Sequence, residues 1–181
     1  NWNELLLSVQ HPARYLSHET NAVYKDPAAV DARFALAFPD AYEIGMSHFG
    51  IQVLYHILNR REDIYCERVF APWVDMEAAM RESGIPLGSQ ETRTALRDFD
   101  IVGFSLQYEL SYTNVLNMLN LGGIPKRSAN RGREHPLVIA GGPCTTNPEP
   151  IAEFFDAFVI GDGEKVALEL VDQFLAWKHQ G

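Results

Sequence analysis

The stretch FDIVGFSL, from Phe99 to Leu106, is a short apolar run without helical spacing. A second run of this kind, PLVIAGG, extends from Pro136 to Gly142. Continuous apolar runs of this length are typical of strands buried on both faces, as in a parallel sheet covered by helices on both sides. Three further runs predict strands, at 33–38 (RFALAF), 63–70 (DIYCERVF) and 157–161 (AFVIG).

Amphipathic segments separate these five runs and predict helices, with Pro72 opening one segment and Gly84 ending it. The helices are expected at 45–61, 73–84, 109–123, 148–156 and 163–178. Strict alternation of strands and helices predicts an α/β fold. We expect a doubly wound, flavodoxin-like (Rossmann-like) sheet of five parallel strands in the order 2-1-3-4-5.

The first 32 residues do not follow this alternation. Within them, WNELLLSVQHPARYL (2–16) predicts a short helix and an extended arm that packs on the domain or on its neighbour. The expected organisation is therefore an N-terminal arm at 1–32 and an α/β domain at 33–181. Because the chain starts at Asn1 rather than Met, we interpret it as a piece of a longer protein.

Composition narrows the function classes. The 181 residues carry a formal net charge of −9, which argues against general binding to a nucleic-acid backbone. We interpret the one basic cluster as a solvated loop: Lys126, Arg127, Arg131 and Arg133. No apolar run approaches the ~18 residues of a membrane span, and no signal peptide is visible. Two isolated cysteines, Cys66 and Cys144, predict neither a disulfide framework nor a metal site and fit a cytoplasmic protein.

Ligands of such sheets bind beyond the carboxyl ends of the strands. The candidate binding residues lie at these ends: Tyr42, Glu43, Gly45, Ser47, Ser105, Leu106, Gly141, Gly142, Pro143, Gly161, Gly163 and Glu164. Glycines there let a large flat ligand approach the backbone, or they only relieve crowding in a turn. Glu164 opens a helix, where a carboxylate is favourable even without a ligand.

Single reactive groups are few at these strand ends. Cys144 has no neighbouring base and is expected to be inert. Ser105 ends the third strand and faces the expected crevice, although such hydroxyls also cap local backbone groups. The imidazoles of His48 and His56 are expected to be packed or exposed to solvent. The sequence therefore predicts neither a catalytic residue nor a metal ligand.

Three common sites of this fold class do not match the sequence. A phosphorylated receiver domain needs an acidic pair after the first strand and an Asp after the third, but the chain has Asp40 alone and then Ser105. A dinucleotide site needs G-x-G-x-x-G, whereas Gly45 and Gly50 are spaced differently. The phosphate loop of a flavin site is also absent. The edge therefore suits a large ligand contacted by several loops, or no ligand.

Three segments carry a family resemblance: PDAYEIGMSHFGIQVLYHILN (39–59), DFDIVGFSLQYELSYTNVLNML (98–119) and VIAGGPCTTNPEPIAEFFDAFVIGDGE (138–164). They resemble the N-terminal cobalamin-binding-like domain of radical S-adenosylmethionine (SAM) enzymes, and more narrowly an uncharacterised bacterial radical SAM family. The pattern GGP…NPEP…D…IGDGE is the most specific part. The resemblance covers essentially the whole chain, including HPARYL at 11–16.

The resemblance implies a catalytic barrel after this domain, which would be its partner. That barrel would carry C-x-x-x-C-x-x-C and bind a [4Fe–4S] cluster and S-adenosylmethionine. Two separate cysteines cannot supply this motif, so the piece is expected to be inactive alone. Residues 177–181 would lead into the linker.

The resemblance also implies a possible cobalamin site without a histidine on cobalt. Related domains that supply this ligand use D-x-H-x-x-G after the first strand. If Gly50 is the final glycine, Gly45 takes the Asp position and Ser47 takes the His position. His48 is one residue out of register, which on a helix turns it by roughly 100°. We therefore expect His48 to point away from the ligand.

Three functions remain open. The chain is a cobalamin-binding accessory domain of a radical SAM enzyme, or a cofactor-free interaction domain that positions substrate or a partner beside the barrel. The third, a free-standing enzyme acting on a small ligand, is disfavoured because no nucleophile is paired with a base.

Overall fold

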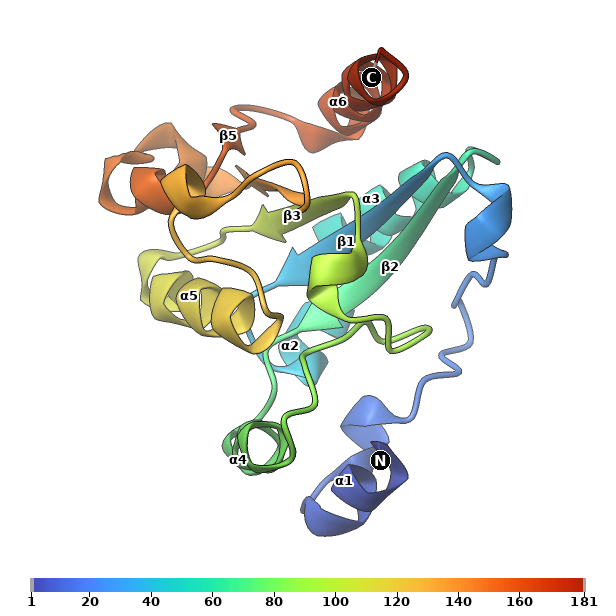
Figure 1. The fold of residues 1–181 in the computed structure, drawn as a ribbon, viewed down its shortest axis with the longest axis vertical. Coiled ribbons are helices and arrows are strands. Elements are labelled where there is room, and N and C mark those ends of the chain that lie inside the picture. The colour runs from blue at the N-terminus through green and yellow to red at the C-terminus, as the bar shows by residue number, and fades with distance from the viewer. Residues whose placement is uncertain (1, 181) are drawn as a thin grey trace.

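Five parallel strands form one sheet in the computed structural model, which describes residues 2–180 (Figure 1). The strand order is β2-β1-β3-β4-β5, which confirms the predicted flavodoxin-like fold. Positions 1 and 181, the outer ends of the predicted arm and domain, lie outside the described residues. The strands are β1 (Ala32–Phe38), β2 (Ile64–Phe70), β3 (Ile101–Ser105), β4 (Leu137–Gly141) and β5 (Ala157–Phe158).

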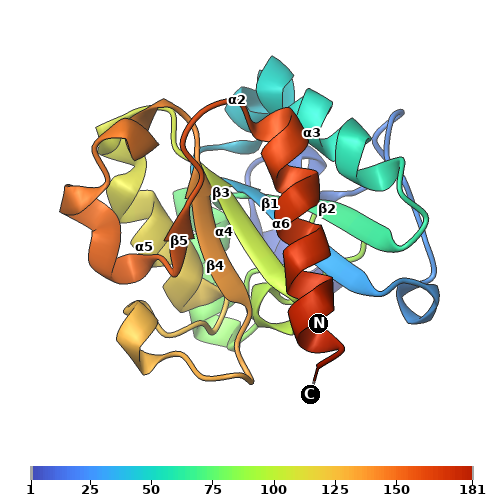
Figure 2. The same cartoon turned by 90° about the horizontal axis from the view of Figure 1, so that it is seen from above.

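Helices cover both faces of the sheet (Figures 1 and 2). Helices α3 (Phe49–Asn59) and α6 (Gly163–Lys178) pack on the face to which β1 contributes its phenylalanines and leucine. Helices α1 (Trp2–Ser8), α4 (Val74–Ser83) and α5 (Tyr112–Leu121) belong to the opposite core, to which β1 contributes alanines. Successive side chains of a strand point to opposite faces, so the RFALAF pattern places large groups under α3 and α6.

The predicted helix over 45–61 is wrong, because the chain breaks at His48 into α2 (Tyr42–Ser47) and α3. His48 has extended backbone angles, with φ −78° and ψ 112°. Gly45 is buried within α2, and a Cβ there would lie 2.3 Å from the Phe70 ring. The break allows α2 to pack closely over the end of β2 while α3 turns back along the sheet.

The segment after β4 also differs from the prediction. Residues Pro143–Thr146 and Glu149–Phe154 form short 3-10 helices rather than one α-helix over 148–156. The prolines at 148 and 150 lack the N–H donors that a regular α-helix needs. Strand β5 is correspondingly reduced to two residues, and the chain leaves the sheet soon after Val159, whose N–H still donates to Ala140 O at 2.7 Å.

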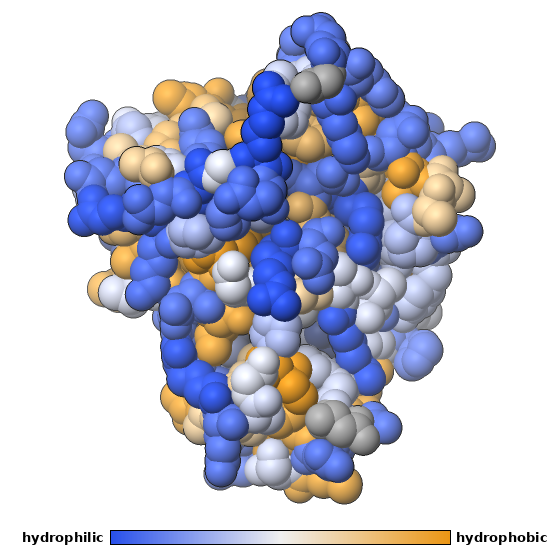
Figure 3. All heavy atoms as spheres, viewed as in Figure 1, coloured by the Kyte–Doolittle hydropathy of each residue, from blue (hydrophilic) through white to orange (hydrophobic). Residues whose placement is uncertain are grey.

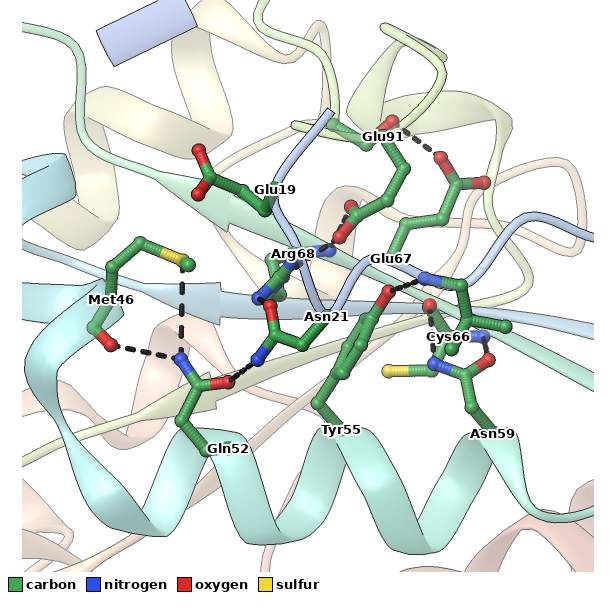
Figure 4. A network of polar contacts seen from close by, with 12 residues as sticks. Glu19, Asn21, Met46, Gln52, Tyr55, Asn59, Cys66, Glu67, Arg68 and Glu91 are labelled. Carbon is green, nitrogen blue, oxygen red and sulfur yellow. Dashed lines mark hydrogen bonds and ion pairs between the residues drawn. The ribbon is translucent and has the colours of Figure 1, made fainter. Parts of the chain in front are cut away.

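The N-terminal arm covers the outer edge of β2, a strand that is buried along its whole length. Helix α1 packs against α4, and the arm continues through Pro12–Tyr15 and Pro27–Ala29. Lys25 Nζ donates to Ile64 O at 2.6 Å. The Asn59 side chain binds Cys66 at both backbone groups, each at 3.0 Å, and so imitates a neighbouring strand (Figure 4). These contacts prevent the edge from pairing with another chain.

A buried ionic network fastens the same edge (Figure 4). Arg68 Nε donates to Glu91 Oε1 at 2.7 Å, and both side chains are fully buried. The Glu91 carboxylate also accepts from the backbone N–H of Arg68. Burial raises the pKa of Glu91. The Arg68 guanidinium stacks on Tyr55 of α3 and donates to Asn21 of the arm at 3.3 Å, so one ion pair joins three segments.

Most of the face shown in Figure 3 is hydrophilic, with smaller apolar patches between the polar side chains. The predicted solvated basic loop is wrong for Arg131. Its side chain is 3% exposed, binds Asp156 at 2.9 Å and donates to the carbonyl of Phe154. Arg131 therefore tethers the loop to the end of the 3-10 segment, whereas Arg127 is exposed. No helix among residues 2–180 combines the length and apolar character that crossing a membrane requires.

Candidate functional site

A cavity of about 240 Å³ opens at the carboxyl edge of the sheet, between the sheet and helices α3 and α6. Its floor is apolar, and small residues on both helices leave the space open. The strands contribute Phe34, Leu36, Gly103, Phe104, Ser105, Ile139 and Gly141. Helix α3 and the residue before it contribute His48, Gly50 and Leu54, and α6 contributes Gly163, Glu164 and Ala167. The loops after the strands contribute Gln107, Gly142, Val159, Gly161 and Asp162.

The double glycine after β4 contains two residues with different roles. Gly142 has φ +98°, and a Cβ there would lie 2.6 Å from the carbonyl oxygen of Leu106. The backbone therefore requires glycine at this position. Gly141 has no atom within 4 Å of the place where a Cβ would stand. No side chain among residues 2–180 fills that space, so the missing side chain of Gly141 enlarges the cavity.

The glycines before α6 divide in the same way. Gly161 has φ +105°, a backbone conformation that favours glycine, so the turn itself accounts for this residue. At Gly163 a Cβ would lie 3.3 Å from Leu54, so glycine lets α6 approach α3 closely. Asp162 and Glu164 beside them are exposed and bring negative charge to the mouth of the cavity.

Six of the predicted site residues lie together on the cavity lining: Ser105, Gly141, Gly142, Gly161, Gly163 and Glu164. The other six lie outside it. Ser47 donates to Ile44 O at 3.0 Å, Leu106 is buried, and Pro143 opens a 3-10 helix. Gly45 packs against Phe70, as described above.

The remaining two predicted residues hold the arm. Glu43 pairs with Arg14 at 2.6 Å, which lowers the pKa of Glu43. The Tyr42 hydroxyl donates to Glu19, and burial together with this bond raises the pKa of Tyr42 to about 12. Both contacts connect α2 to the arm, so these residues serve its attachment.

The expectation that His48 points away from the site is wrong, because His48 lines the cavity. The helical rotation of roughly 100° does not apply, since the helix is interrupted at this residue. Its ring packs against Phe38 with centroids 5.2 Å apart and the two planes tilted by 41°. Within the described part of the chain, its Nδ1 is buried without a hydrogen-bond partner. A histidine that binds a metal through one ring nitrogen almost always donates a hydrogen bond from the other. His48 has no such bond to hold its ring in place as a ligand.

Gln107 follows the third strand but is missing from the predicted site residues, and its Nε2 donates to Ser105 Oγ at 2.8 Å. Its position two residues after Ser105 was the available signal, since alternate residues of an extended segment share a side. The apolar floor was also missed, although the alternation in RFALAF marks it.

In residues 2–180, no group of three His, Cys, Asp or Glu side chains could hold a metal ion. Burial raises the pKa of Cys66, which leaves that thiol unreactive.

An apolar rim surrounds the carboxyl edge. Among the exposed large apolar side chains of the described residues, seven follow the carboxyl ends of β1, β2, β3 or β5: Ile44, Phe49, Trp73, Val74, Tyr108, Leu110 and Ile160. Phe49 is 80% exposed and Leu110 85%. The Tyr108 hydroxyl donates to Asp40 at 2.6 Å and bridges the ends of β1 and β3. Exposed apolar groups gathered at one edge are typical of a surface that another molecule covers.

Comparison with known proteins identifies the family. The family model described as "Radical SAM proteins, N-terminal" matches residues 50–181, which is most of the chain and contains nearly all of α3, all of α6 and most of the cavity. An uncharacterised protein of Methanocaldococcus jannaschii is 25% identical over 142 residues. The match covers 77% of this chain but 26% of that protein, so the chain spans about a quarter of its relative. The chain belongs to the family of radical SAM N-terminal domains.

Proposed function

We propose that this chain is the accessory domain of a radical SAM enzyme and binds cobalamin at the carboxyl edge of its sheet. The observation that carries the proposal is the cavity beside Gly141, where open space meets an apolar floor and a few polar groups. Binding sites for small molecules commonly combine these features. The [4Fe–4S] cluster and S-adenosylmethionine would belong to a catalytic barrel that partners this domain.

The size of the cavity limits which part of cobalamin it holds. At about 240 Å³ it is smaller than the roughly 300–1,000 Å³ of typical ligand pockets. It would therefore take only the nucleotide tail, with the base on the apolar floor near Ser105. The corrin ring would lie outside, over the strand ends and against the apolar rim. Bound in this way, cobalamin would supply the cobalt chemistry that no side chain of the site offers.

The residues around His48 favour a cobalt atom without a protein nitrogen. The buried Nδ1 of His48 has no partner that would orient the ring as a ligand, and Ser47 bonds to its own helix. Electron paramagnetic resonance of the Co(II) form should therefore show no nitrogen splitting. A triplet pattern that disappears in His48→Ala would contradict this and identify His48 as the ligand.

The direct test is retention of hydroxocobalamin after desalting, measured by the visible spectrum. The natural chain should retain the cofactor, and Gly141→Leu should lose it because leucine occupies the cavity. Thr146→Leu is the control, since it adds similar bulk at an exposed site outside the cavity. Circular dichroism checks that all three proteins are folded. Equal retention in Gly141→Leu would place the ligand elsewhere.

The apolar rim supports a second candidate, a cofactor-free domain that docks on the barrel of the same protein. In that case the folded chain would retain no cobalamin, and the rim would contact protein alone. Leu110→Glu and Phe49→Glu, placed in the full-length enzyme, should then weaken the contact between the two domains. Limited proteolysis between domain and barrel measures this, with the exposed Glu82→Gln as control.

A further inference from the structure

Two side chains of the cavity lining, Ser105 and Gln107, bond to each other and leave further hydrogen-bonding groups without a partner among residues 2–180. Ser105 Oγ accepts a hydrogen bond from Gln107 Nε2 at 2.8 Å. Within residues 2–180, no acceptor for the Ser105 hydroxyl hydrogen and no donor for Gln107 Oε1 lies within hydrogen-bonding distance. The pair therefore offers the Ser105 hydroxyl as a donor and Gln107 Oε1 as an acceptor to whatever enters the cavity, besides the second N–H of the Gln107 amide.

The surrounding backbone fixes this pair. Ser105 is the last residue of β3 and lies opposite Gly141 in the sheet. Between the two side chains, Leu106 is buried and bonded on both sides: its N–H donates to Gly141 O at 2.8 Å, and its carbonyl accepts from Cys144 N at 3.2 Å. A Cβ on Gly142 would lie 3.2 Å from Gln107 Nε2, so glycine there leaves room for the amide.

We propose that Gln107 positions Ser105 and selects the base of the cofactor tail, an inference that rests on the proposed cobalamin site. Because Ser105 accepts from Gln107, its hydroxyl is free to donate to a ring nitrogen. Gln107 Oε1 accepts from an amino group on the same edge of the base. Adenine carries both groups side by side, whereas dimethylbenzimidazole has the acceptor nitrogen and no donor. The cavity therefore prefers a corrinoid with an adenine base.

The rest of the cavity agrees with a flat, uncharged base. Phe34 and Ile139 provide an apolar floor for a planar ring. Asp162 and Glu164 at the mouth oppose an anionic group inside the cavity, so the phosphodiester of the tail would stay outside it. A phosphate deep in the cavity would meet no lysine or arginine among its lining residues.

Titration of the purified chain with three corrinoids, followed by visible absorbance, tests the preference. The probes are pseudocobalamin with an adenine base, cobalamin with a dimethylbenzimidazole base, and cobinamide with no base. Pseudocobalamin should bind about tenfold more tightly than cobalamin, as one additional hydrogen bond predicts, and cobinamide should bind most weakly. Gln107→Leu should remove the tenfold preference. Ser105→Ala should weaken both based corrinoids, because both lose the ring-nitrogen contact.

Several results would overturn the inference. Equal binding of pseudocobalamin and cobalamin would show that Gln107 does not read the base. An equal loss of both in Gln107→Leu would make it a structural residue, and cobinamide binding as tightly as cobalamin would place the base outside the cavity. Failure of the folded chain to bind any of the three corrinoids is a different result, which overturns the proposed function and this inference together.

Discussion

The outer edge of β2 and the carboxyl edge of the sheet both collect polar groups, but they use them differently. At β2, the backbone groups of Cys66 and Arg68 that face away from β1 are bound by Asn59, Gln90 and Glu91 at 2.7–3.0 Å. At the carboxyl edge, Gly141 leaves open space and Ser105 has an unused donor. Polar groups that are buried and paired stabilise a fold, whereas unused groups beside open space indicate a binding site.

This comparison predicts that substitutions at the β2 edge change stability and that substitutions at the carboxyl edge change binding. The strongest test is Glu91→Ala, which leaves the buried Arg68 guanidinium without its ionic partner. The free energy of unfolding should fall by about 3–5 kcal/mol. Urea denaturation measures the loss, with exposed Glu82→Ala as control. A loss below about 1 kcal/mol would mean that the network contributes little to the fold.

Asn59→Leu tests the backbone contacts of the same edge. It removes the partners of the Cys66 N–H and carbonyl groups, and each buried unpaired group costs about 1–3 kcal/mol. We expect a loss of about 2–4 kcal/mol and faster hydrogen exchange at the Cys66 amide. Asn59→Asp keeps an acceptor for that amide and should protect it better than leucine does. Unchanged exchange in Asn59→Leu would contradict the edge contact.

The two adjacent glycines sharpen the comparison within one turn. Gly142→Ala should destabilise the chain by about 1–3 kcal/mol, because alanine is strained at φ +98° and contacts the Leu106 carbonyl. Gly141→Ala should change stability by less than about 0.5 kcal/mol. Thermal denaturation of the pair measures the difference. Equal losses of stability would contradict the conclusion that the backbone requires glycine at 142 while Gly141 only leaves space in the cavity.

The smallest expected effect concerns the arm and its pH dependence. Arg14 lowers the pKa of Glu43 below its usual value near 4.5. The pair therefore contributes fully to the free energy of unfolding at pH values above about 4.5, and this contribution is lost as the pH falls through the lowered pKa of Glu43. Because the Glu43 side chain is 55% exposed, Glu43→Gln should reduce stability at pH 7 by less than about 1 kcal/mol, and the difference should vanish in strong acid. Denaturation at several pH values measures this, and a difference that grows toward acid would contradict it.

The sequence by itself determined the fold class and the edge at which the site lies. Apolar runs such as FDIVGFSL and amphipathic segments such as 163–178 are local patterns, and their alternation leaves few sheet topologies. Because strand ends were predictable, so were Ser105, Gly141 and Glu164 as residues of the carboxyl edge. The prolines at 148 and 150 were visible, but their effect on the helix was underestimated.

Only the tertiary structure decided what the individual residues do. Gly141 and Gly142 are identical in sequence terms, and the Leu106 carbonyl of another strand end distinguishes them. The direction of His48 follows from a break in the helix, and the ion pair of Arg68 joins residues 23 positions apart. These features depend on contacts between distant segments, whereas strands and helices follow from the periodicity of neighbouring residues.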